Sequence, residues 1–324
     1  MTTQRGFTLI EMAIVLVIIT FLIGGLAMPL AAQIQGRRIA ETNKTLEEAR
    51  EAIIGYAMSH PASSSSCVCT YAVEVTGTCL TALNSASPAA CSSLCPSAAN
   101  VALTLPTCPA TGTGPLTLTL PMARHYLPCP DLNGADPEPN LDNDGVNGLT
   151  DLNNGVEDRF PGTPLGSPYV AGTECFPPTS PTPPSFGNLP WVTLGAAAQD
   201  AWGNRLHYAV TAPFANSSTG FSSTDPGNLQ VCSASDCATV NVAGDVPAVL
   251  VSYGPNGWGA RNVNGTTLKD PTSPDELENT NTDVNFVSRS PTKPDATGGE
   301  FDDLVKWISA DQLRGRICPA GGCP

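Results

Sequence analysis

The chain has 324 residues, which is room for one large or two modest domains. Its formal net charge of −14 argues against nucleic acid as a direct ligand, because phosphate binding needs clustered Lys and Arg. Only 14% of the residues are charged, which excludes a disordered acidic polymer, while 31 Pro and 30 Gly indicate a turn-rich body.

The N-terminal segment runs from Arg5, Gly6 and Phe7 into an apolar stretch that contains one carboxylate, Glu11. A secretory signal peptide would place its cleavage site after a short apolar core, whereas this stretch is long and the candidate cut precedes it. An ordinary membrane anchor needs about 20 apolar residues, which residues 7–32 supply. Neither alternative explains Glu11, since a carboxylate in hydrocarbon is costly and usually has a functional partner.

This segment resembles the class III leader and N-terminal helix of type IV pilins and of type II secretion pseudopilins. The resemblance implies that a prepilin peptidase cuts after Gly6 and that Phe7 becomes the N-methylated terminus. It also implies that Glu11 serves in assembly. Burying an unpaired carboxylate is costly, so pairing Glu11 with the Phe7 amine of a neighbouring subunit would remove that cost and fix the axial register.

One long helix is predicted from Phe7 to about Ser59, with residues 7–32 transmembrane. Pro29 either ends the anchor or weakens the helix locally. Apolar side chains of the second half recur every seven residues, at Ile39, Leu46 and Ile53. Charged residues fill the other faces, so this half is amphipathic and can be the spine of a domain.

Twelve cysteines in turn-rich sequence favour an oxidising compartment and a disulfide framework. The candidate pairs are Cys129 with Cys175, Cys232 with Cys237, and Cys318 with Cys323. Six more cysteines lie in a Ser-, Thr- and Ala-rich insertion over residues 61–121, and their pairing stays open. Alternating residues 116–120 predict a strand there. Zinc is the alternative use of the cysteines, but the three histidines are scattered.

A loop rich in Asp, Asn and Gly contains an N-x-D-x-D-G-V-x-x-x-x-D pattern. A calcium loop of EF-hand type has oxygen ligands at its first, third, fifth and seventh positions and a carboxylate at its twelfth. The residues at these positions are Asn140, Asp142, Asp144, Val146 through its carbonyl, and Asp151. Asn at the first position and Asp at the twelfth depart from the pattern, and no flanking helices are predicted. Calcium is one interpretation and ordinary turns are the other.

Residues 122–324 are predicted to form a β domain. A D-x-W-G-x-x-x-x-Y pattern at 200–208 and an apolar run at 248–254 suit a turn and two strands. These features, and the pair Asp302 and Asp303 before a Trp-containing strand, resemble the C-terminal sheet of major pseudopilins. That resemblance implies a second possible calcium site at Asp302 and Asp303. Three more carboxylates are either ligands or solvated turn residues: Glu278, Asp283 and Glu300.

The sequence contains no catalytic constellation. No G-x-S-x-G elbow occurs, and His125 and His207 lie in no motif. No pair of carboxylates is singled out for glycosidase-type chemistry. We therefore expect that the protein is not an enzyme.

Together these observations predict an α+β fold. Its parts are a leader (1–6), a long N-terminal helix (7–60) with a transmembrane half (7–32) and an amphipathic half, a Cys-rich insertion (61–121), and a C-terminal pilin-like β domain with an acidic loop (122–324). The helix is expected to pack on a small antiparallel β-sheet, under a disulfide-rich and loop-rich head.

The resemblance implies a structural subunit of a type IV pilus or of a type II secretion pseudopilus. Its partners would be other pilin or pseudopilin subunits, the prepilin peptidase and an inner-membrane assembly platform. The cysteines favour a single-pass protein with a cytoplasmic N-terminus and a periplasmic body. A minor, tip-located subunit is possible within this class, although Glu11 argues against the tip pseudopilin. The alternative is a membrane-anchored exported adhesin or binding module that does not polymerise.

Overall fold

The computed structural model describes the helical and sheet-forming parts of the chain. The described residues are 9–62, 69–74, 115–120, 124–131, 154–158, 175 and 185–317, without 218, 223, 239–241 and 297. Side chains are described in these ranges except at 22–31, 69–74 and 115–120.

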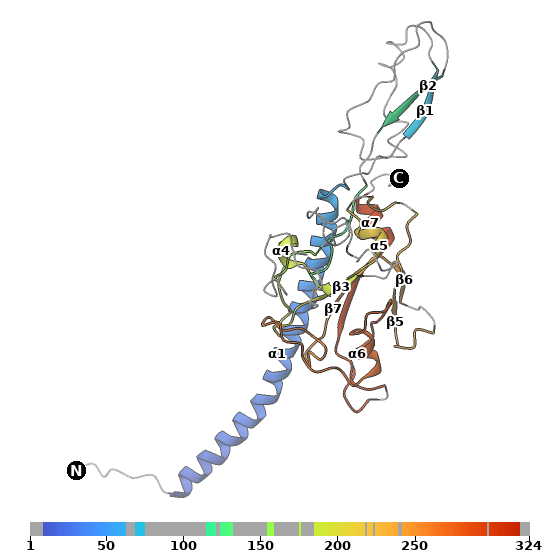
Figure 1. The fold of residues 1–324 in the computed structure, drawn as a ribbon. Helices are drawn as coiled ribbons and strands as arrows, with labels where there is room; N and C mark the ends of the chain where they lie inside the picture. Colours follow the sequence, from blue (N-terminus) through green and yellow to red (C-terminus); the bar gives the residue numbers. More distant parts are fainter. Residues whose placement is uncertain are drawn as a thin grey trace, which may run out of the picture.

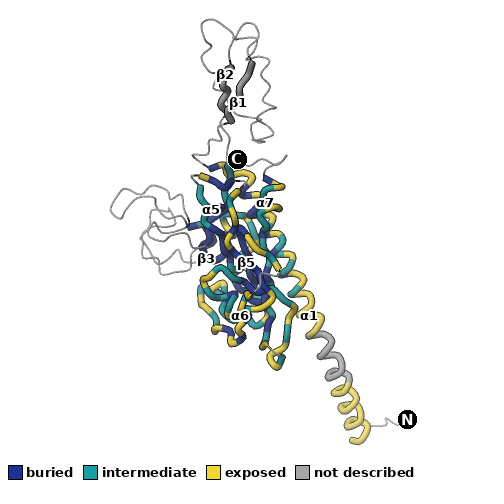
Figure 2. The backbone as a smooth tube through the Cα atoms, turned by 90° about the vertical axis from the view of Figure 1, so that its right-hand side faces the viewer, coloured by how far each residue is buried: buried dark blue, intermediate teal, exposed yellow. Residues whose placement is uncertain are grey.

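A single helix, α1 (Leu9–Ser59), is 51 residues long and holds the body of the molecule against its second half (Figure 1). The long N-terminal helix of the predicted fold is therefore present, and it continues through Pro29. Its first turns carry exposed apolar side chains, with Leu9 90% and Phe21 78% exposed. Figure 2 shows this exposed segment projecting away from the buried body. No helix in the described part of the chain combines the length and apolar character needed to cross a membrane.

The second half of α1 is amphipathic, as its seven-residue period predicts. Leu46, Ile53, Ile54 and Ala57 are fully buried in one hydrophobic cluster with the sheet. The opposite face of the helix is exposed and charged, for example at Glu48. The apolar stripe thus decides which side of α1 the body covers.

The central sheet has four antiparallel strands in the order β3-β4-β7-β9. Its strands are β3 (Ser185–Asn188), β4 (His207–Val210), β7 (Ala248–Ser252) and β9 (Leu304–Ile308). Because side chains alternate along a strand, Tyr208 and Leu250 face the cluster that contains α1. Val249 and Val251 face a second cluster on the other side of the sheet.

A second sheet covers that other side. It has the order β6-β5-β8, built from β5 (Leu229–Cys232), β6 (Ala243–Val246) and β8 (Asn285–Val287). Strand β5 pairs antiparallel with β6 and parallel with β8. Val231 and Phe286 from this sheet pack with Val249 of the central one. The prediction of one small antiparallel sheet was therefore incomplete, and the body has a helix, sheet, sheet arrangement.

Short elements complete the fold. They are the helices α4 (Trp191–Leu194), α5 (Ala212–Ala215), α6 (Pro274–Glu278) and α7 (Ala310–Ile317), and the paired strands β1 (Cys69–Glu74) and β2 (Pro115–Leu120). The strand predicted at 116–120 is confirmed as β2. Helix α7 returns to α1, where Leu313 and Ile317 join the first cluster and Arg316 pairs with Glu51 at 2.9 Å.

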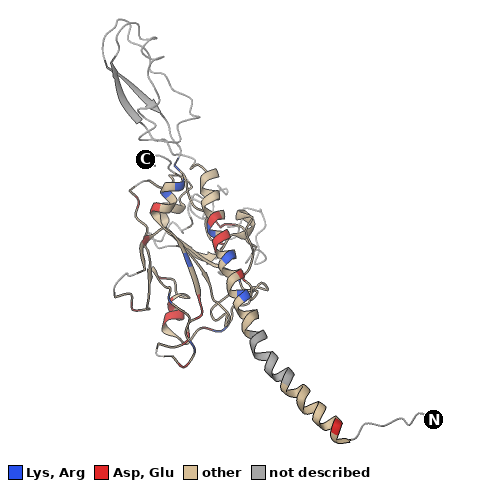
Figure 3. Ribbon diagram, turned by 180° about the vertical axis from the view of Figure 1, so that it is seen from behind, with Lys and Arg blue, Asp and Glu red and all other residues tan. Residues whose placement is uncertain are grey.

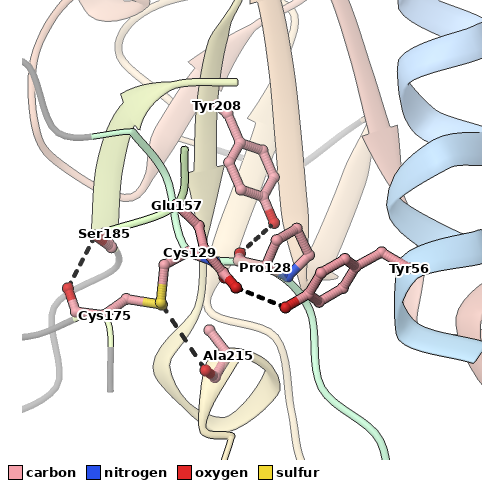
Figure 4. Close-up of a disulfide and its surroundings, with 8 residues drawn as sticks. All are labelled: Tyr56, Pro128, Cys129, Glu157, Cys175, Ser185, Tyr208 and Ala215. Carbon is pink, nitrogen blue, oxygen red and sulfur yellow. Dashed lines mark hydrogen bonds between the residues drawn. A yellow bond between two sulfur atoms is a disulfide. The ribbon is translucent and has the colours of Figure 1, made fainter. Parts of the chain in front are cut away.

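The described part of the chain contains two disulfides, and both are pairs that the cysteine spacing predicts. Cys129 and Cys175 are joined across 46 positions of sequence, and Cys232 and Cys237 across 5. Next to the first of them, Glu157 accepts hydrogen bonds from the Tyr56 hydroxyl at 2.7 Å and from the Cys129 amide at 2.9 Å (Figure 4). This segment of the body is thereby tied to α1. Cys318 and Cys323 lie outside the described residues.

Candidate functional site

The first candidate site is the start of α1. Glu11 is the acidic residue of the first turn, and its side chain is exposed. Large apolar residues surround it on all sides of the helix, among them Ile10, Met12 and Ile14, which are 68%, 52% and 54% exposed. A helix that is apolar all round needs lipid or other helices to cover it. Gly6 and Phe7 lie outside the described residues.

The body contacts α1 only along the second half of the helix. The buried Thr42 hydroxyl accepts a hydrogen bond from the Ala201 amide at 3.2 Å. The Trp202 indole N–H donates to Gln35 Oε1 at 3.4 Å. Further along, Lys306 pairs with Glu47 at 3.3 Å. The helix therefore leaves the body at about Gln35. Its described side chains before that point, at 9–21 and 32–34, are exposed.

The turn that supplies Ala201 and Trp202 is organised by one carboxylate. Asp200 Oδ1 accepts hydrogen bonds from the amides of Trp202 and Asn204, both at 2.9 Å. Its Oδ2 accepts from the Ser252 hydroxyl at 2.7 Å. Burial raises the pKa of Asp200, while these hydrogen bonds act against that shift. The predicted D-x-W-G turn thus connects central strand β7 to α1.

The second candidate site is a cluster of three carboxylates, Glu276, Asp302 and Asp303. Their ligand oxygens all lie within 4.8 Å of one another. Glu276 comes from α6, whereas Asp302 and Asp303 immediately precede β9. Glu276 is 1% and Asp303 4% exposed. The structure therefore brings the predicted acidic pair together with a third residue that sequence reasoning missed.

Neighbouring polar groups hold these carboxylates in place. The Asn256 side-chain amide donates to both carboxylate oxygens of Glu276, at 3.3 and 3.4 Å. The Asn256 backbone N–H donates to Asp302 Oδ2 at 3.2 Å. Asn279 donates to Asp303 Oδ2 at 2.8 Å. Gly254 has a φ of +59°, and a Cβ there would lie 2.2 Å from the Asp302 carbonyl oxygen. A side chain at position 254 would therefore displace Asp302.

The electrostatics of the cluster are unfavourable for three bare anions. Burial, with Glu276 as the next cause, raises the pKa of Asp302 to about 7. Burial also raises the pKa of Asp303 well above its ordinary value, and that of Glu276 above its own. Asp302 Oδ1 is buried and has no hydrogen-bond partner among the described residues. Oxygen-only donors with an unsatisfied buried oxygen fit a hard cation such as calcium.

The three other carboxylates, for which ligand and solvated turn residue were both open, are not part of this cluster. Glu278 and Asp283 instead share the Asn281 side-chain amide, at 3.1 and 3.3 Å. Glu300 is close enough to raise the pKa of Asp302 further through its charge. Nothing in the sequence around Glu276 pointed to it, since a Pro-Asp-Glu helix start is common.

The predicted calcium loop falls in a part of the chain that the structure does not describe, at Asn140, Asp142, Asp144, Val146 and Asp151. The described segments on either side of the loop, 124–131 and 154–158, are hydrogen-bonded to each other. Asp131 Oδ2 accepts a hydrogen bond from the Gly155 amide at 2.8 Å, and the Asp158 amide donates to the Pro130 carbonyl at 3.1 Å. The flanks of the loop are therefore fixed to each other.

Comparison with known families identifies the N-terminal segment. Residues 1–27 match the prokaryotic N-terminal methylation motif, which is the class III prepilin signal of type IV pilins and pseudopilins. This motif implies a membrane-anchored, exported protein that is processed by prepilin peptidase and assembles with other pilin subunits. The family that carries it is structural rather than enzymatic. No curated protein and no solved structure matches the chain.

Proposed function

We propose that this chain, which carries the class III prepilin signal, is a structural subunit of a type IV pilus or a type II secretion pseudopilus. The observation that carries the proposal is the match of residues 1–27 to the methylation motif. The exposed apolar start of α1 supports it, because a filament core of packed helices would cover that surface.

In this proposal residues 7–32 cross the inner membrane before assembly and enter the filament core afterwards. The N-terminus is cytoplasmic and the body periplasmic, where the disulfides can form. Cleavage after Gly6 creates an amine on Phe7. Glu11 of one subunit then pairs with the Phe7 amine of its neighbour, which neutralises a carboxylate that would otherwise be costly to bury.

Assembly of a Glu11→Ala variant tests this function. We expect the variant to be exported and membrane-inserted but to form no filaments, measured by shearing and sedimentation from cells that contain the assembly machinery. Glu41→Ala is the matched control, because Glu41 is an exposed acid on the same helix in the part that the body holds. Normal assembly of Glu11→Ala would instead favour an anchored adhesin or binding module that does not polymerise.

We also propose that Glu276, Asp302 and Asp303 hold a calcium ion. The ion would supply positive charge between two buried carboxylates and one half-buried one, and would link α6 to the start of β9. Its role would be structural, since it joins two segments of the body that are far apart in sequence. The loop with Asn140, Asp142, Asp144, Val146 and Asp151 is a second, separate calcium proposal that depends on its sequence pattern alone.

A further inference from the structure

Two arginines follow closely on the proposed membrane segment. Arg37 and Arg38 lie on α1 just where the helix leaves the body, and both are exposed. Neither makes an ion pair or a hydrogen bond with any described residue. The other two cations of the helix are engaged, because Lys44 pairs with Glu48 at 3.4 Å and Arg50 with Glu47 at 2.7 Å. Figure 3 shows how charged residues gather on this second half of α1.

The body contacts one side of the helix around these arginines, through Trp202 and Gln35, and leaves another side open. A Cβ placed on Gly36 would meet no atom within 4 Å, and Ile34 is 46% exposed. We call residues 34–38 of α1 the neck. Adjacent helical residues point about 100° apart, so Arg37 and Arg38 lie on two neighbouring sides of it. There is therefore room at the neck for another molecule to approach both guanidinium groups.

The position of the arginines matches the headgroup layer of a bilayer. Arg37 follows Ala32 by five positions, which is about 8 Å along an α-helix. The polar layer on each side of the hydrocarbon core is roughly 5–8 Å thick. Arg37 and Arg38 would therefore lie at the level of the lipid phosphates when residues 7–32 span the membrane.

Charge favours an anionic partner at this point. The chain carries a net charge of −14, so an anionic membrane surface repels its body. A guanidinium binds phosphate oxygens through two parallel hydrogen bonds, which a hydrated lysine ammonium does not. Two free arginines at the neck would offset the repulsion where the acidic body comes closest to the membrane.

We infer that Arg37 and Arg38 bind the phosphates of anionic phospholipids in the leaflet next to the body. The inference rests on the proposed membrane insertion of residues 7–32. It adds a lipid partner to the unassembled subunit, whose acidic body is then held at the membrane surface in a fixed orientation. On assembly into a filament, the arginines would have to exchange these phosphates for other contacts.

Native mass spectrometry of the full chain in detergent tests the inference, with phosphatidylglycerol or phosphatidylcholine as the added lipid. We expect the wild type to bind phosphatidylglycerol more tightly. Arg37→Gln/Arg38→Gln should weaken this binding by roughly fivefold for each arginine replaced and leave phosphatidylcholine binding unchanged. Lys44→Gln is the control, because Lys44 already pairs with Glu48, and it should bind like the wild type.

Three outcomes would overturn the inference. One is equal binding of both lipids by the wild type, and another is full displacement of phosphatidylglycerol by inorganic phosphate, which would indicate a site for the free anion. The third is a variant that keeps its lipid preference but fails to form filaments, because the arginines would then contact a second subunit. Lipid binding can be measured on the uncut chain, so a failure of leader cleavage would contradict the proposed function without affecting this test.

Discussion

At the scale of single residues, burial and hydrogen bonding distinguish carboxylates that could bind a cation from ordinary turn carboxylates. Glu276 and Asp303 are almost fully buried, and together with Asp302 they would repel one another strongly as three anions. Glu278 and Asp283 lie in a similarly acidic stretch but are satisfied by Asn281. The unpartnered oxygen of Asp302 therefore separates a candidate cation site from ordinary turn carboxylates.

Calcium should stabilise the body through this cluster. We expect the thermal unfolding midpoint to rise on adding calcium, since a ligand that binds only the folded state stabilises by about 2.7 kcal/mol at 100 times its Kd. Asp302→Asn/Asp303→Asn should lose that rise. Without calcium the same variant should be no less stable than the wild type, because like charges have been removed.

The matched variant Asp142→Asn/Asp144→Asn separates the two proposed sites. It should keep the part of the calcium effect that comes from Glu276, Asp302 and Asp303. A calcium-induced rise that survives in Asp302→Asn/Asp303→Asn and disappears in Asp142→Asn/Asp144→Asn would move the site to the acidic loop.

His207 predicts a pH dependence of a different origin. Its Nε2 is buried without a hydrogen-bond partner among the described residues, and the rings of Phe186 and Tyr253 lie 6.2 and 6.0 Å away. Burial lowers the pKa of His207 to about 4. The unfolded chain, with a pKa near 6.5, therefore binds more protons between these two values, and stability falls as the pH drops through this window.

Replacing the ring isolates this effect. His207→Phe should remove roughly 1–3 kcal/mol of the stability loss between about pH 6.5 and 4, because Phe has no group that the unfolded chain can protonate. Urea unfolding at several pH values measures the difference from the wild type, in which contributions of the carboxylates cancel. His60→Phe, at an exposed histidine, serves as the control. Identical pH profiles for His207→Phe and the wild type would contradict the assignment.

At the scale of elements, the turn at Asp200 connects the sheet to α1. Its carboxylate accepts two backbone amides and the Ser252 hydroxyl, and the turn presents Ala201 and Trp202 to the helix. The Asp200 side chain therefore fixes the turn that leads into β4. It also positions the contacts of Ala201 and Trp202 with α1.

Removing the Asp200 carboxylate should weaken the contact between this turn and α1. Asp200→Ala leaves two amides and one hydroxyl without their acceptor, which should cost about 2–4 kcal/mol of unfolding free energy. Hydrogen exchange should rise at the Ala201 and Trp202 amides. Asp295→Ala, at an exposed acid, should change the stability by less than about 0.5 kcal/mol. Equal stability of the two variants would contradict this role for Asp200.

How far the sequence predicts these elements depends on the range of the interactions. Helix α1 was predictable, because its seven-residue apolar period lies within one segment. The second sheet was not, since β5, β6 and β8 are only three or four residues long and β8 pairs with β5 from a distant part of the sequence. Glu276 could not be predicted as a site residue for the same reason, because only the folded chain brings α6 next to the start of β9.

At the scale of the whole molecule, α1 divides the chain into two functional parts. From about Gln35 onward the helix belongs to a body of two sheets closed by disulfides. Before that point its described side chains, at 9–21 and 32–34, are exposed, and the apolar first turns begin at Leu9 and carry Glu11. Such a division fits a subunit whose body is displayed while its helices pack together.

The most direct test is intact-mass and N-terminal analysis of the protein recovered from cells with an active prepilin peptidase. Processing as a prepilin predicts a mature chain that starts at N-methylated Phe7 and lacks residues 1–6. A Gly6→Leu variant should remain uncut in the same cells and provides the reference mass. Recovery of the wild type with Met1 still in place would contradict processing by the peptidase, and with it assembly as a pilin-like subunit.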